Sequence, residues 1–455
     1  MKIHHRGFLL FLFLPVLLIG NLAAADTVNP ELEVTAILQK NAEIPRFQGD
    51  LTEQAKFPEW FRKPLSLQKI LWIALNRNPE LKAKLAEAPI TVAEMKQLGL
   101  VESPELDFLT HVPVDSPGFR TEYGVSATQN IMDLIQRPSR KRVGKAEYES
   151  KKWEISAELL SLLTQVKISY YDYQAALQLR AFRQADLSAA QSAAGLAQGQ
   201  WKAGNISVLD EAQRRAFLQT AQLEYAKSVS EAKQARIRLA KLAGIPWDHS
   251  QWKIVEKLPH LPARDPKLER LKEWAKLHRP DLVAQKYKIE SKEQGVQLAR
   301  RAYLPKLNAG ISADWDPEGN QGLGPTVALG LPLLGHRKIG IQKAQADLNA
   351  SRQLLSAMEQ NIPYDFDQLY QQLLLARQSA RFYETEILPV QRRILEESLK
   401  HYNYMLLSNY QLLQNKQNQI EAQRNYIQAL RDYWIAYAGM ENLLGGAIEG
   451  LEREK

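Results

Sequence analysis

The side chains that could carry out chemistry are few and scattered along this sequence. It contains eight histidines and no cysteine, which leaves no thiol nucleophile, no disulfide and no thiolate metal site. It shows no glycine-rich phosphate loop, no nucleophile motif and no His and carboxylate group with metal-ligand spacing. We interpret the histidines as structural or surface residues rather than ligands; they are His4, His5, His111, His249, His260, His278, His336 and His401. The sequence therefore predicts no enzyme activity, no cofactor and no metal site.

Basic residues gather after two segments that we interpret as β-hairpins, at the start of the helix that follows each one. Positive charge at a helix N-terminus opposes the macrodipole, so local stability does not explain these residues. One hypothesis is that they face anionic headgroups at the inner rim of a membrane. The alternative, solvated charge at a junction, is about equally favoured. The residues are Arg137, Arg140, Lys141, Arg142, Arg337 and Lys338.

The first 25 residues have the composition of a cleaved signal peptide. Lys2 and Arg6 precede an apolar run from Phe8 to Ile19, and three alanines end at Ala25. A membrane anchor is the weaker alternative because the run is short and contains Pro15. Without a cysteine, no lipid can be attached to one after cleavage. Removing the two basic residues lowers the formal charge from +8 to about +6 (8 − 2), and we see no case for nucleic acid.

The elements that would position any functional residue are long helices. Between Pro138 and Pro246 the chain is rich in helix formers and is interrupted only at 203–207. We expect one arm at 143–202, on the order of 90 Å long, and a return arm at 208–243 of roughly 55 Å. Small and apolar residues in the return arm fit heptad spacing and predict a packing seam: Leu209, Ala212, Ala216, Leu223, Ala226 and Ile237. Tyr426, Tyr433 and Tyr437 predict an aromatic line in the core of the second half.

The chain repeats itself at a constant offset. Gly244 recurs as Gly445, an offset of 201 (445 − 244), and the same offset carries Asn78-Pro79 onto Arg279-Pro280 and Pro104 onto Pro305. We therefore divide the chain into a signal peptide (1–25), an extended or partly disordered lead-in (26–65), repeat 1 (66–246), a linker (247–264), repeat 2 (265–446) and a tail (447–455). Each repeat opens with short helices, the second capped by Asp265 before Pro266. Pro363 and Pro389 should kink or split the long arm of repeat 2.

Each repeat also contains a segment with a period of two. The expected β-hairpins span 105–134 and 306–334, and the helical hairpins that follow span 141–244 and 339–445. In the clearest strand, the apolar positions are Leu307, Ala309, Ile311, Ala313 and Trp315. Four strands of about ten residues match the length that crosses a bilayer. Two ordinary surface hairpins are the alternative interpretation.

Four strands cannot close a barrel, and an open sheet edge cannot sit in lipid. A membrane interpretation therefore requires several copies of the chain, and three copies would supply about twelve strands. The competing hypothesis is a periplasmic coiled-coil scaffold or adaptor, which shares export and long helical hairpins. Such a protein has no need for alternating strand pairs.

The order and spacing of these segments resemble the TolC-type outer membrane efflux family over nearly the full mature length. The resemblance rests on Leu75 to Leu81, its repeat His278 to Leu282, Leu304 to Leu307, Ala203 to Asp210 and Ile420 to Tyr426. It implies a mainly α fold with a transmembrane β-barrel of twelve strands shared by a homotrimer, and a periplasmic barrel of helices. The implied function is the exit duct of a tripartite efflux or secretion system, in the bacterial outer membrane.

The partners that the resemblance implies are a periplasmic adaptor and an inner-membrane pump, with a drug or heavy metal as substrate. The implied adaptor-docking tips are Gly204, Asn205, Ile206, Ser207, Met405, Leu406, Leu407 and Ser408, and Met405 stands where the family has glycine. Family members often carry acidic residues at a pore constriction in the second repeat. Here that region offers Ser408 and Gln411, and Asp210 of the first tip is the one acidic candidate.

Overall fold

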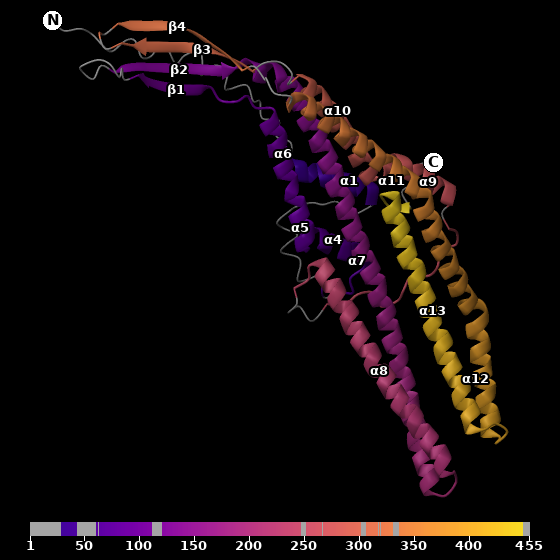
Figure 1. Ribbon diagram of the computed structural model, residues 1–455. Helices are drawn as coiled ribbons and strands as arrows, with labels where there is room; N and C mark the ends of the chain where they lie inside the picture. Colours follow the sequence, from indigo (N-terminus) through magenta and orange to yellow (C-terminus); the bar gives the residue numbers. More distant parts are fainter. Residues whose placement is uncertain are drawn as a thin grey trace.

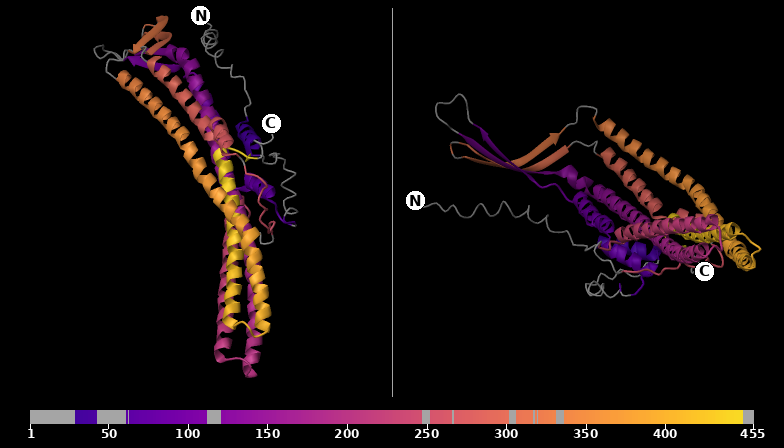
Figure 2. Two further views of the ribbon diagram at one scale, coloured as in Figure 1. Left: turned by 90° about the vertical axis from the view of Figure 1, so that its right-hand side faces the viewer. Right: turned by 90° about the horizontal axis from the view of Figure 1, so that it is seen from below.

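The computed structural model shows an elongated molecule with a β-sheet at one end and two helical hairpins reaching to the other end (Figure 1). It describes residues 29–42, 61, 63–111, 121–246, 252–265, 267–301, 306–316, 318, 320–330 and 336–448. The expected signal peptide and residues 449–455 of the expected tail lie outside the described residues. The two hairpins run side by side along the shaft, as the two views in Figure 2 show.

The first repeat contains short helices, two strands and then a very long helix. Its elements are α4 (Leu67–Arg77), α5 (Pro79–Leu85), α6 (Glu87–Leu98), β1 (Glu105–His111), β2 (Glu122–Asn130), α7 (Ile131–Lys202) and α8 (Val208–Ala243). Helix α7 has 72 residues and is about 108 Å long at 1.5 Å per residue. It therefore reaches from the sheet to the far end of the molecule.

The second repeat follows the same plan with a broken long arm. Its elements are α9 (Leu268–His278), α10 (Pro280–Arg301), β3 (Lys306–Trp315), β4 (Gln321–Gly330), α11 (His336–Phe382), the π-helical turn η1 (Tyr383–Ile387), α12 (Leu388–Asn403) and α13 (Asn409–Leu444). The same order of short helices, strand pair and helical hairpin thus occurs twice, as the duplication predicts.

The four strands form one antiparallel sheet in the order β1-β2-β3-β4, so the two hairpins join through β2 and β3. The register places Phe108 opposite Val125, Val125 opposite Ala313 and Ala313 opposite Leu323, all on one face. The residues one position along, Asp107, Ser126, Ser312 and Gly324, are paired on the other face. One face is therefore apolar and the other is polar and built of small residues.

The expectation of an extended lead-in at 26–65 is wrong for residues 30–42, which form the helix α1 (Pro30–Ala42). Val34 and Leu38 are buried in the core one helical turn apart, and Glu33 pairs with Lys152 of α7 at 2.9 Å. Pro30 at the first helical position and acidic residues in the first turn are ordinary helix-start signals. The sequence contained this signal, and the prolines further along obscured it.

The expected hairpin 105–134 is too long, because α7 begins at Ile131, within the segment predicted as strand. The Asn130 side chain accepts a hydrogen bond from the backbone N–H of Asp133 and so starts the helix. Pro138 lies inside the helix and not before it. An ion pair between Asp133 and Arg140 braces the two turns on either side of that proline.

The two prolines of the second long arm behave differently from each other. Helix α11 runs through Pro363 without a break, so the arm is not split there, and a kink at Pro363 stays a prediction. Ile362 and Phe366, on either side of it, are fully buried, and this packing holds the helix together. At Pro389 the predicted split occurs as the π-helical turn η1, whose wider turn accommodates a residue that has no N–H.

The predicted heptad seam of α8 is also wrong for the single chain. Its larger members, Leu209, Leu223 and Ile237, are all exposed. The buried residues of α8 are instead Ser228, Ala232, Ala235, Leu239 and Ala243. Both faces of this helix fit heptad spacing, and the face with smaller side chains packs inward because it lets helices approach closely.

In the second half, Tyr433 is fully buried and its ring contacts Trp434 and Tyr437, which confirms the predicted aromatic line as core.

An extended segment at 252–265 crosses the middle of the shaft and joins the two repeats. Ile254 forms a parallel bridge with Leu65, and Gln174 of α7 donates hydrogen bonds to the carbonyls of Val255 and Lys257. Asp265 does not cap a helix, because the cap position before α9 belongs to Lys267. The Asp265 carboxylate instead accepts hydrogen bonds from Arg377 and Tyr433.

Candidate docking tips, constriction and membrane rim

The two tips lie together at the end of the molecule opposite the sheet (Figure 2). At the first tip, Gly204 takes a left-handed conformation with φ of 75°, and the N–H of Asn205 bonds back to the carbonyl of Gln200. Ser207 then starts α8, since its hydroxyl accepts a hydrogen bond from the N–H of Asp210 at 3.1 Å. The structure thus brings Gly204, Asn205, Ile206 and Ser207 into one tight turn.

The second tip has the same backbone with a different side chain at the critical position. Met405 takes φ of 60°, which is the one positive φ at a non-glycine residue in the described chain. Ser408 starts α13, since its hydroxyl accepts a hydrogen bond from the N–H of Gln411 at 3.3 Å. Met405 is 94% exposed, and Tyr404, Leu406 and Tyr410 are also largely exposed. The second turn itself thus exposes large apolar side chains, whereas at the first tip the exposed apolar residues, Trp201, Val208 and Leu209, lie on the helices that flank the turn.

Replacing Met405 with glycine should stabilise the second tip. An L-residue in the left-handed region is strained by roughly 1–2 kcal/mol, and glycine gives back roughly half of this through its freer unfolded chain. We expect a local gain of about 0.5–1 kcal/mol, seen as slower amide exchange in the last turn of α12 and the first turn of α13. Leu406→Gly is the matched control, because Leu406 has no left-handed strain to relieve. Equal or faster exchange in Met405→Gly would show that the strain is absent.

The two constriction candidates occupy equivalent places just beyond the tips. Asp210 is held locally, because its carboxylate accepts a hydrogen bond from the Ser207 hydroxyl at 2.6 Å. Gln411 is exposed in the first turn of α13. Near them, the guanidinium of Arg214 on α8 lies 5.4 Å from the ring centroid of Tyr402 on α12. This contact joins the two hairpins, and sequence analysis did not single out either residue.

Two of the five basic rim residues whose side chains the structure describes have local partners. Arg137 donates to the carbonyl of Gly99 at 2.9 Å, and Arg140 donates to the carbonyl of Leu100 and pairs with the buried carboxylate of Asp133. Both carbonyls follow the last turn of α6, where positive charge is favourable. The expectation that local stability explains none of these residues is therefore wrong for Arg137 and Arg140.

The other rim residues are less engaged. Lys141, Arg142 and Lys338 are exposed, and nothing is described for the side chain of Arg337. Arg142 lines a cavity between α7 and α10 together with two acidic residues, Glu149 and Glu290. Among the rim residues that the structure describes, the geometry leaves Lys141 and Lys338 as the candidates to meet a negatively charged surface.

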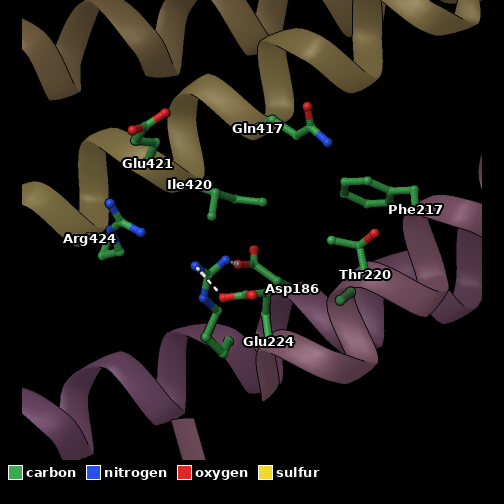
Figure 3. Close-up of a pocket in the computed structure, with 10 residues that line it drawn as sticks. Asp186, Phe217, Thr220, Glu224, Gln417, Ile420, Glu421 and Arg424 are labelled. Atoms are coloured by element: carbon green, nitrogen blue, oxygen red, sulfur yellow. Dashed lines mark hydrogen bonds and ion pairs between the residues drawn. The ribbon is translucent and has the colours of Figure 1, made fainter. Parts of the chain in front are cut away.

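A cluster of charged residues that the sequence did not indicate lies on the tip side of the middle of the shaft. Asp186 of α7 is buried near Arg183, Glu224 of α8 and Lys416 of α13. Arg183, Asp186 and Glu224 border a cavity of about 290 Å³ between the two hairpins (Figure 3). Helices of scattered charge give no sequence signal for such a cluster, because its members are up to 233 residues apart (416 − 183).

Two further properties of the described residues concern metals and membranes. Within those ranges, no three His, Asp or Glu side chains come together as a group that could hold a metal ion. None of the described helices combines the length and the apolar character needed to span a bilayer.

Comparison with known proteins gives matches over most of the chain. The model of the family described as "Outer membrane efflux protein" matches residues 71–245 and 272–446, which are the two repeats. The cobalt-zinc-cadmium resistance protein CzcC of Cupriavidus metallidurans is 22% identical over 428 residues, covering 90% of this chain and 97% of that protein.

Solved structures share the fold. A membrane protein from Pseudomonas aeruginosa superimposes with a TM-score of 0.71 at 17% identity, over 84% of this chain and 90% of that one. The CmeC outer membrane channel of Campylobacter jejuni gives a TM-score of 0.69 at 16% identity, over 84% and 85% of the two chains.

Proposed function

Since the chain belongs to the outer membrane efflux protein family, we propose that it is the exit duct of a tripartite efflux system in the outer membrane. In this role it is a passive conduit and not an enzyme. Its sheet lies in the membrane, its shaft extends into the periplasm, and its tips meet a periplasmic adaptor that is coupled to an inner-membrane pump. Because the relative CzcC is a cobalt-zinc-cadmium resistance protein, divalent metal cations are the first substrate class to test, and organic drugs are the second.

The observation that carries this proposal is the two-faced sheet. Phe108, Leu323, Val327 and Leu329 are large, exposed and on the apolar face. In the described part of the chain, the outer edges of β1 and β4 pair with no further strand. An apolar face suits lipid, but open edges do not, because unpaired backbone groups are costly there. Three copies joined edge to edge would give a closed barrel of about twelve strands with the polar face inside.

The shaft supports the same assembly. The apolar residues of α8 that do not face its own chain, including Leu223 and Ile237, form a stripe that a neighbouring copy would bury. The scaffold alternative leaves both the stripe and the apolar sheet face in water. A homotrimer therefore accounts for two separate exposed surfaces with one arrangement.

The decisive experiment compares two neighbouring residues on opposite faces of β1. Phe108→Arg places a charge on the proposed lipid face, at a cost of roughly 2–4 kcal/mol near the midplane. Asp107→Arg places the same side chain on the proposed lumen face. We expect Phe108→Arg to lose most of the salt-resistant membrane fraction and of the trimer, and Asp107→Arg to retain both and to form channels in planar bilayers.

The unmodified protein provides the control for that comparison. It should resist extraction by high salt and should have the mass of three chains in detergent. A lone particle that washes off the membrane would favour the scaffold. Equal insertion of the two arginine variants would mean that the apolar face does not meet lipid.

A further inference from the structure

The Asp186 carboxylate is buried without the hydrogen bonds that an ionised carboxylate needs. Its side chain is only 5% exposed, and its Oδ2 atom has no hydrogen-bond partner. The nearest cations are too far away for a hydrogen bond, with Lys416 Nζ at 3.8 Å from Oδ1 and Arg183 Nη1 at 3.9 Å from Oδ2. Arg183 is also shared with Glu224, at 3.4 Å. Two carboxylates thus compete for one guanidinium.

The surroundings of Asp186 contain the junction between the two helical hairpins. Ile420 of α13 and Phe217 of α8 point into the gap in Figure 3, and Thr220 lies beside Phe217. The charged residues that border the cavity come from all three helices: Arg183 and Asp186 from α7, Glu224 from α8, and Glu421 and Arg424 from α13. Lys416 of α13 reaches Asp186 from the tip side. The Nε atom of Arg424 is also buried without a partner. Buried polar atoms on both α7 and α13 therefore lack hydrogen-bond partners at this junction.

Burial raises the pKa of Asp186 above its ordinary value, and the attraction of Lys416 and Arg183 offsets this only in part. The packed arrangement therefore binds a proton more tightly than an arrangement in which water reaches the carboxylate. It follows that protonation stabilises the packed junction, and that this stabilisation is lost as the pH rises through the raised pKa. Above this raised pKa the ionised carboxylate works against the packing around it.

We propose that Asp186 is a destabilising charge built into the junction, which biases α13 and its hairpin to move away from α7 and α8 and admit water. Lys416 acts in the opposite sense, since it is the cation that makes the ionised carboxylate tolerable in the packed state. The two residues therefore have opposite effects on the packed junction. In a clamp, by contrast, the ion pair between them would hold the junction closed and both residues would stabilise it. These opposite effects are a property of the helix packing within one chain, so they hold whether or not the proposed efflux role is correct.

The test uses the absence of cysteine from the chain. Ala221→Cys places one thiol in the wall of the cavity, where its alkylation by a maleimide reports how often the junction opens. Asp186→Asn keeps the shape and removes the charge, so alkylation should slow by about fivefold or more, the size of one buried unsatisfied polar group. Lys416→Gln should accelerate it by a similar factor. A clamp predicts faster alkylation in both variants.

Three controls accompany this pair. Each rate is divided by the rate for the same variant in denaturant at the same pH, which removes differences in thiol reactivity. Asp347→Asn removes an exposed carboxylate on α11 and should change nothing. In the Asp186→Asn background, Lys416→Gln should lose its effect, because the cation no longer has a charge to balance.

A pH series gives an independent measurement. With Asp186 present, the corrected alkylation rate should fall as the pH is lowered, because protonation of the carboxylate stabilises the packed junction. In Asp186→Asn the side chain does not titrate, so the corrected rate should stay flat above the ordinary pKa of a carboxyl group, since hydrogen bonding to Lys227 lowers the pKa of the neighbouring Glu224. Faster alkylation in Asp186→Asn, or a rate that neither substitution changes, would overturn the proposal. So would an unchanged pH dependence in Asp186→Asn.

Discussion

Gly244→Ala should lower the stability of the protein by about 2–5 kcal/mol, although the substitution removes no polar contact. Gly244 ends α8 with φ of 66°, where an L-residue is strained. A Cβ atom there would lie 2.5 Å from the backbone carbon and oxygen of Arg77, and 2.6 Å from the backbone nitrogen of Asn78. Backbone atoms at the α4–α5 junction cannot give way as a flexible side chain would.

The structure around Gly244 makes the two helix ends dependent on each other. The Asn78 side chain donates a hydrogen bond to the carbonyl of Leu242 at 2.6 Å and accepts hydrogen bonds from the N–H groups of Glu80 and Leu81. The same side chain therefore caps the start of α5 and binds the end of α8. Moving the α8 end to make room for a Cβ would break this arrangement. The measurement is the midpoint of thermal unfolding followed by the helical signal at a fixed scan rate.

Gly204→Ala is the control that separates strain from crowding. Gly204 has a similar φ of 75°, but a Cβ there would meet no atom within 4 Å. Gly204→Ala should show only the left-handed strain, less the gain from a stiffer unfolded chain, which leaves a loss of about 1 kcal/mol. Gly445→Ala should resemble Gly244→Ala, because its Cβ would lie 2.6 Å from Pro280 Cδ. If Gly244→Ala were as mild as Gly204→Ala, the tight contact with Arg77 would not exist in the folded protein.

These contacts explain why part of the fold was predictable from the sequence. The residues that revealed the duplication include Gly244 with Gly445 and Pro79 with Pro280, and each glycine lies against the junction that precedes or contains its proline. Glycine and proline are restricted by backbone geometry and recur in both copies, whereas Asn78 is replaced by Arg279. The strand alternation was predictable for a similar reason, since a period of two places Phe108 and Asp107 on opposite faces wherever the sheet lies.

The errors also have physical causes. Proline disfavours a helix interior, but tertiary contacts hold α7 and α11 together through Pro138 and Pro363. The heptad pattern indicates the wrong face of α8 because both faces are apolar enough to fit it, and only the neighbouring helices decide between them. The Asp186 cluster could not be predicted, since its charges are ordinary helix residues until α7, α8 and α13 come together. The tip turns were predictable because local capping chemistry alone forms them.

Asp265→Asn should destabilise the join between the repeats by about 2–4 kcal/mol. Asp265 and Arg377 are 13% and 15% exposed, and their ion pair fixes the end of the linking segment to α11. Tyr433 of α13 donates to the same carboxylate at 3.1 Å, and burial raises the pKa of Tyr433, so it stays a donor well into alkaline solution. Neutral asparagine would leave the Arg377 charge buried and uncompensated, because its amide oxygen and the carbonyls of Pro262 and Ala263 are all neutral acceptors.

A surface ion pair and a paired substitution test that explanation. Glu397→Gln removes an exposed i,i+3 partner of Lys400 and should leave the unfolding midpoint unchanged. Adding Arg377→Met to Asp265→Asn removes the stranded charge and should restore part of the lost stability, because an apolar side chain is better tolerated there than an unpaired guanidinium. If the double variant were less stable than Asp265→Asn alone, the hydrogen bonds of Arg377 to the linker carbonyls would stabilise the protein by more than its unpaired charge costs. The repeats would then be joined chiefly by the hydrogen bonds of Arg377 to the linker backbone.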